Sequence, residues 1–143
     1  MSKPQLLKAF TVWGDPAGAI RMSQSDRWIG SATRRPRTEK EAARQAQLHR
    51  TRDFRERVLE ASGYGKKKTL YVPAMITMRI YFAIPPNKKT NPGMVHTQTP
   101  DTDNVLKAVK DALFKNDQMI WCDHAEKYWD DGKGPRVDVE LLC

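Results

Sequence analysis

Two aspartates, Asp101 and Asp103, stand two residues apart in the segment TPDTDNVLKAVKDAL, which covers residues 99–113. Side chains two apart in an extended segment point to the same side, so both carboxylates could be aimed at one point. Hard divalent cations such as Mg²⁺ bind carboxylate oxygens of this kind, usually together with water and a phosphate. Lys107 follows one helical turn after Asp103, where an ammonium group could stabilise the charge that develops during phosphoryl transfer. The spacing indicates metal-dependent chemistry on a phosphate ester.

The same residues also permit a structural interpretation, with Asp103 as a helix N-cap and Lys107 as a solvated surface residue, and spacing alone leaves both interpretations open. Two other interpretations fail. A calcium-binding EF-hand loop starting at Asp101 needs Gly at its sixth position and Glu at its twelfth, where Leu106 and Ala112 stand. A phosphotransferase nucleophile in a DxD motif normally ends an apolar strand, whereas this motif follows the polar residues HTQTP.

A third acid that would complete such a site is Asp123, which follows a short apolar run in the segment QMIWCDHAEKYW. Metal-dependent hydrolysis of a phosphodiester requires an acid of this kind at a strand edge beside the start of the helix. A zinc site is disfavoured, because Cys122, Asp123 and His124 lack the usual two-residue gap between structural zinc ligands.

The helix that must position these acids is predicted from about Asp103 to Phe114. A projection at 100° per residue puts five polar residues on one face: Asp103, Asn104, Lys107, Lys110 and Asp111. The opposite face is apolar and is expected to pack on the core; it consists of Val105, Leu106, Ala108, Val109, Ala112 and Leu113.

Further elements are predicted from the spacing of apolar residues and from the positions of glycine and proline. Thr38 and Glu41 form a capping box for a helix from about Glu39 to Ala61, stopped by glycines. We expect its core-facing residues to be Ala42, Ala43, Ala46, Phe54, Val58 and Leu59. We also expect a central strand at Thr69 to Ile84, a polar loop to Pro100, and further strands at Ala9 to Trp13, at Met119 to Cys122 or Lys127 to Trp129, and at Arg136 to Leu142.

The chain has 143 residues and a mass of 16.4 kDa, which fits one domain over residues 1–143. Residues 21–68 hold 14 Lys and Arg against 6 Asp and Glu, while the rest of the chain is balanced. This basic half suggests a polyanionic partner. No apolar run approaches the roughly 20 residues that cross a bilayer. Two cysteines do not make a disulfide framework, so we expect a reduced, cytoplasmic protein without a membrane partner.

The run PDTDNVLKAVKDAL followed by IWCDHAE resembles the signature of the RusA family of Holliday junction resolvases, PDxDNxxKxxxDxL and then a WxDD-like segment. Weaker similarity extends to a GxPxxxxR-like opening at Gly14, Pro16 and Arg21, and to the strand after Thr69. The chain departs from the family at His124, where a second Asp is frequent, and at Glu126, where Gln is common.

The resemblance implies a small, single-domain α+β fold with a mixed β-sheet and two main helices, acting as a homodimer. It implies that Asp101, Asp103 and Asp123 bind Mg²⁺ or Mn²⁺, that Lys107 assists, and that the dimer resolves four-way DNA junctions by paired nicks. The alternatives are a catalytically silent module that binds branched DNA, and a phosphodiesterase acting on RNA or flaps. The expected contacts to the DNA backbone are Arg21, Arg27, Arg34, Arg35, Arg37, Lys66, Lys67, Lys68, Lys88 and Lys89.

Overall fold

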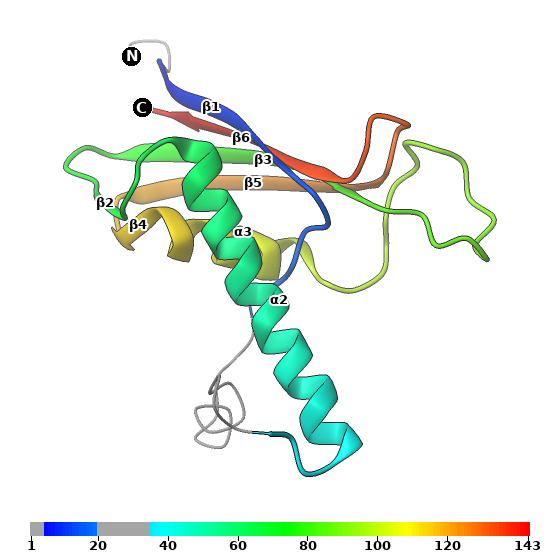
Figure 1. Ribbon diagram of the computed structural model, residues 1–143. Coiled ribbons are helices and arrows are strands. Elements are labelled where there is room, and N and C mark those ends of the chain that lie inside the picture. The colour runs from blue at the N-terminus through cyan, green and yellow to red at the C-terminus, as the bar shows by residue number, and fades with distance from the viewer. Residues whose placement is uncertain (1–4, 20–34) are drawn as a thin grey trace.

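The computed structural model describes residues 5–19 and 35–143, in which strands and helices follow one another in an α+β arrangement (Figure 1). The elements are β1 Leu6–Trp13, α2 Glu39–Ser62, β2 Lys68–Thr69, β3 Ala74–Phe82, α3 Thr102–Leu113, β4 Phe114–Asn116, β5 Ile120–Trp129 and β6 Arg136–Leu142.

The main sheet has the strand order β1-β6-β3-β5. β3 pairs antiparallel with β6 and parallel with β5, so the sheet is mixed and β3 is an interior strand, as predicted. Alternate residues of β3 from Ala74 to Phe82 are buried, whereas the residues between them are half-buried or exposed. This period of two is that of a strand with one face on the core. β5 lies at the edge of the sheet, and β2 and β4 form a separate short parallel pair.

Both described helices cover one face of the sheet (Figure 1). All six apolar residues predicted on one side of α3 are buried, which confirms the amphipathic pattern. They pack with Phe54 and Val58 of α2 and with the buried residues of β3 and β6. The core therefore holds α3 in a fixed orientation against the sheet, and its polar side is left facing outward.

The helix α2 begins and ends where the capping signals predict. The Thr38 hydroxyl accepts a hydrogen bond from the Glu41 N–H at 3.1 Å, and Gly63 ends the helix in the left-handed region at φ 73°. The prediction that Ala42, Ala43 and Ala46 face the core is wrong, since all three are exposed. The first half of α2 extends past the sheet and α3, so its burial begins only at Leu48 (Figure 1).

Strand boundaries differ from the predictions in three places. β1 begins three residues earlier than expected, and the segments expected as alternatives, 119–122 and 127–129, are the two ends of the single strand β5. The predicted long strand from Thr69 is divided, because residues 70–73 form a loop that ends at Pro73 before β3 starts. Among the described helices, none is both long and apolar enough to cross a membrane.

Candidate active site

Asp101 is the N-cap residue of α3, in extended conformation at φ −69° and ψ 156°. Its side chain makes no capping hydrogen bond to the described helix, which leaves its carboxylate available for another ligand. Asp103 lies in the first turn and is exposed, so the interpretation of Asp103 as the cap is wrong. Negative charge is favoured at both positions, because the N-terminal end of a helix carries partial positive charge.

Lys107 is exposed one turn after Asp103 and has no ion-pair or hydrogen-bond partner among residues 5–19 and 35–143. Its helical spacing places it on the same outward side as Asp103. An ammonium group without an acidic partner can donate to a phosphate oxygen at no loss of an existing contact.

Asp123 comes from the other element of the predicted site, the edge strand β5. It pairs in register with Ile76, which is fully buried on β3, so Asp123 lies on the face of the sheet that the helices cover. Its Oδ2 is 3.2 Å from the Nζ of Lys110 in α3, and the same Nζ is 3.8 Å from Asp117. Lys110 thus connects the strand acid to the helix that carries Asp103.

The predicted metal ligands have suitable chemistry but are not gathered in the described structure. Carboxylate oxygens are the donors that Mg²⁺ and Mn²⁺ prefer. Within residues 5–19 and 35–143, however, no three His, Cys, Asp or Glu side chains lie close enough together to hold one ion. Asp101 and Asp103 have no described partner to give up, and the one described ionic partner of Asp123 is Lys110. The donor set therefore fits a divalent cation, provided that Asp123 leaves Lys110.

The loop before α3 is fixed by Lys127, a residue that the sequence analysis did not single out. Its Nζ donates hydrogen bonds to the carbonyl oxygens of Gln98 at 2.6 Å and Pro100 at 3.0 Å. Lys127 lies four residues after Asp123 on β5, and the alternation of the strand puts both on the same face. That alternation was the only available signal for Lys127. The residue holds the backbone that leads directly into Asp101.

His96 secures the same loop from within the core. Its ring stacks on Phe82 at 4.3 Å between centroids and lies 4.2 Å from Trp129. Its Nδ1 accepts a hydrogen bond from the Gln98 N–H, which requires an unprotonated Nδ1. Burial, followed by the positive charge of Lys127, lowers the pKa of His96. His96 is therefore neutral at physiological pH.

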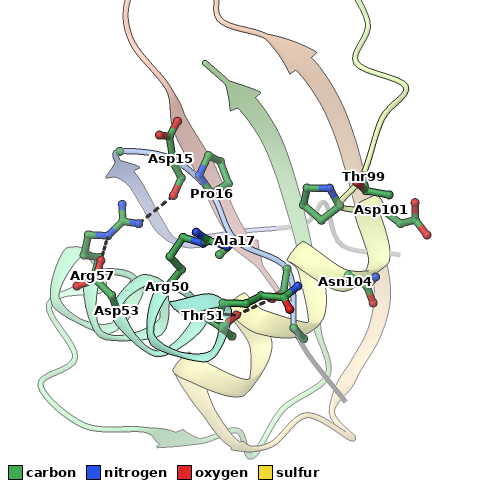
Figure 2. A pocket seen from close by; sticks show the side chains of 15 residues that line it. Asp15, Pro16, Ala17, Arg50, Thr51, Asp53, Arg57, Thr99, Asp101 and Asn104 are labelled. Carbon is green, nitrogen blue, oxygen red and sulfur yellow. Dashed lines mark hydrogen bonds and ion pairs between the residues drawn. The ribbon is translucent and has the colours of Figure 1, made fainter. Parts of the chain in front are cut away.

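A groove borders the N-terminal end of α3 (Figure 2). Its volume is about 630 Å³, and it lies between α2, the segment 14–19 after β1, and the start of α3. Figure 2 shows Arg57 and Asp53 at one end and Asp101 and Asn104 at the other. The groove thus extends from the arginine-rich helix α2 to Asp101, the N-cap residue of α3.

The basic residues predicted to contact DNA do not form one cluster. Arg35 and Arg37 lie before α2, Lys66 to Lys68 follow its C-terminal end, and Lys88 and Lys89 lie in the loop after β3 (Figure 1). All of them are exposed except Lys88, which is half-buried with its Nζ 4.8 Å from the centre of the Trp129 ring. Three more predicted contacts fall outside the described residues: Arg21, Arg27 and Arg34. Arg21 is also a position of the weaker resemblance.

A comparison with protein-family models finds a match over residues 30–142 to the family described as Endodeoxyribonuclease RusA. The match includes α2, α3, β3 and β5, and with them every predicted acidic residue and Lys107. No curated protein matches the chain.

Proposed function

Since the chain belongs to the RusA endodeoxyribonuclease family, we propose that it cleaves four-way DNA junctions by paired nicks with the help of Mg²⁺ or Mn²⁺. One observation carries the proposal. Asp101 at the N-cap of α3 and Asp103 and Lys107 in its first turns are exposed, and none of their charged groups has a partner among the described residues. Two anions and one cation at the start of a helix are suited to a metal ion and the phosphate that it would activate.

In this proposal Asp101, Asp103 and Asp123 would hold the cation through their carboxylate oxygens. When bound, the cation supplies the Lewis-acid charge that assists water in attacking the scissile phosphate. The ammonium group of Lys107 binds a non-bridging oxygen of that phosphate and stabilises the additional charge of the transition state. Lys127 keeps the backbone before Asp101 in place, so that the first ligand is already positioned before DNA arrives.

Paired cleavage is supported by comparing the number of candidate sites in one chain with the number of cuts in one junction. The described residues offer one candidate acidic site, whereas a four-way junction requires two cuts on opposed strands. A homodimer with two-fold symmetry presents one site to each strand. The interior position of β3 removes its edges from consideration as an interface. Sedimentation equilibrium is expected to give about twice 16.4 kDa.

We place this activity in DNA recombination and repair in the cytoplasm, a location supported by two free thiols, Cys122 and Cys143, among the described residues. Exposed lysines and arginines are expected to supply affinity for the DNA backbone without reading sequence.

The decisive assay incubates the purified protein with a labelled synthetic four-way junction in Mg²⁺, in Mn²⁺ or in EDTA. We expect symmetric nicks with either metal and intact DNA in EDTA. Tight junction binding without cleavage in any metal would instead identify a silent binding module. Preferential cleavage of a flap or an RNA substrate in the same panel would identify a phosphodiesterase with a different substrate.

A further inference from the structure

We propose that the groove between α2 and the segment 14–19 holds the DNA strand next to the cleaved phosphodiester, and that Arg50 binds a phosphate there. This inference rests on the proposed nuclease function and adds a strand path and a contact residue to it. The predicted DNA contacts on other parts of the surface do not include Arg50. The groove is lined from α2 by Gln47, Arg50 and Thr51, and it ends at Asp101 and Asn104.

The segment 14–19 forms the groove wall opposite α2, and hydrogen bonds hold it to the rest of the domain. Arg57 donates from its two terminal nitrogens to the carbonyl oxygens of Trp13 at 2.6 Å and Asp15 at 2.9 Å. Farther along, the Thr51 hydroxyl donates to the Gly18 carbonyl at 3.1 Å, and the Ala19 N–H donates to the Asn104 carbonyl at 2.8 Å. These bonds tie one segment to both helices, so the groove exists before any ligand binds.

Gly18 shows how closely this wall approaches α3. A Cβ atom at Gly18 would lie 2.9 Å from the Cβ of Pro100 and 3.2 Å from the Cβ of Asn104. Glycine therefore permits the close approach. Because of it, the end of the groove directly adjoins the residue that precedes Asp101.

The two arginines in the groove differ in their availability. Arg57 uses its guanidinium group for the two carbonyl oxygens and for Asp53 at 3.2 Å, which makes it a structural residue. Arg50 is exposed and has no ion-pair or hydrogen-bond partner within the described ranges. In Figure 2 its guanidinium group lies toward Ala17, in the middle of the groove, whereas the Asp15 carboxylate points away from it.

The lining favours a phosphodiester strand as the occupant. Arg50 offers a planar group of N–H donors that suits phosphate oxygens, and the exposed side chains of Gln47 and Asn104 offer further polar contacts. The groove also reaches Asp101, so a strand cleaved there would continue into it. The Arg50 guanidinium group would therefore bind a neighbouring phosphate of the strand, and Lys107 would bind the reacting phosphate.

The test compares two matched variants, Arg50→Gln and Arg52→Gln. Both remove one exposed positive charge from α2, and glutamine preserves most of the side-chain length and the helix propensity. Two residues along a helix correspond to a rotation of about 200°, so Arg52 lies on the side away from the groove. Thermal denaturation of both variants checks that the fold is retained.

Binding of each variant to a four-way junction is measured by fluorescence anisotropy in EDTA, over a range of salt concentrations. We expect Arg50→Gln to weaken binding by roughly tenfold and to reduce the slope of log K against log salt by about 1.8, which is about 0.9 for each of the two phosphate contacts that a homodimer would lose. Arg52→Gln is expected to change binding by less than about twofold. Equal effects of the two variants would overturn the groove proposal, because they would mean that the positive charge of α2 attracts DNA without a contact specific to Arg50.

Single methylphosphonates, which neutralise one phosphate at a time, then locate the contact. At one position close to the cleavage point, the replacement should weaken binding to the wild type but not further weaken binding to Arg50→Gln. Additive losses at every position would contradict the proposed contact. Junction binding that depends on Arg50 in a protein that never cleaves would refute the nuclease function and leave the groove in place.

Discussion

The Nζ of Lys110 lies 3.2 Å from the Oδ2 of Asp123 and joins the polar side of α3 to the edge strand β5. Asp123 is about half exposed, whereas Lys110 is largely covered. The pair holds the strand acid against the polar side of α3, but it also occupies the carboxylate that the proposed metal site requires. In the proposed site, metal binding and the Lys110 contact would therefore compete for Asp123.

This competition predicts the effect of Lys110→Gln. Removing the nearby positive charge should tighten Mn²⁺ binding by about threefold, since charges near a partly exposed site interact with modest energy. The loss of a partly exposed ion pair should lower the free energy of unfolding by no more than about 1 kcal/mol. Isothermal titration calorimetry measures the affinity. Unchanged Mn²⁺ affinity in a folded variant would argue that Asp123 is not a ligand.

Lys107→Ala should lower the single-turnover cleavage rate by about 10²-fold or more, because its ammonium group is expected to act where charge accumulates in the transition state. Junction affinity should fall by less than about threefold. Lys115→Ala, which removes an exposed lysine from β4, is the matched control and should leave both quantities nearly unchanged. If the two variants behave alike, Lys107 is an ordinary surface lysine.

Lys127→Met should affect the site through the backbone. It removes the charged donor from the carbonyl oxygens of Gln98 and Pro100, at a cost of about 1–2 kcal/mol in unfolding free energy. Because that backbone leads into Asp101, Mn²⁺ affinity should also fall. Lys127→Arg, which retains a donor, should restore part of it. A loss of stability with unchanged metal affinity would show that Lys127 supports the fold alone.

The buried imidazole of His96 predicts a pH dependence of stability. Burial and Lys127 lower its pKa in the folded protein below the unfolded value of 6.5, and Lys88 adds to this effect. The unfolded chain therefore binds the proton more readily, and stability should fall as the pH decreases below about 6.5. In His96→Phe, which keeps a ring between Phe82 and Trp129, the unfolding free energy should change less between pH 7.5 and 5. An equal pH dependence in both proteins would contradict this origin.

The sequence predicts some parts of this molecule better than others, for physical reasons. The buried face of α3 follows from strict spacing of apolar residues, and the capping box of α2 is a local signal. The exposed alanines of α2 were misassigned because alanine suits either a core or a solvated helix face, and only the tertiary arrangement shows that this part extends past the sheet. The same limit applies to Lys110 and Lys127, whose partners come from distant segments.

The groove is also invisible in the sequence, since it requires the segment after β1 to cross α2 and reach Asn104. The acidic residues were found because their spacing is local and their order resembles a family signature. The ionic contact of Asp123 could not be found in that way.

The central claim is that the N-terminal end of α3 carries the nuclease site, and Asp101→Asn tests it most directly. The substitution removes one carboxylate charge from an exposed residue whose side chain forms no capping hydrogen bond to the described helix. Single-turnover cleavage and binding should be measured on the same four-way junction in Mg²⁺. We predict that cleavage falls by at least about 10²-fold while junction affinity stays within about twofold. Cleavage at the wild-type rate by this variant would contradict the account.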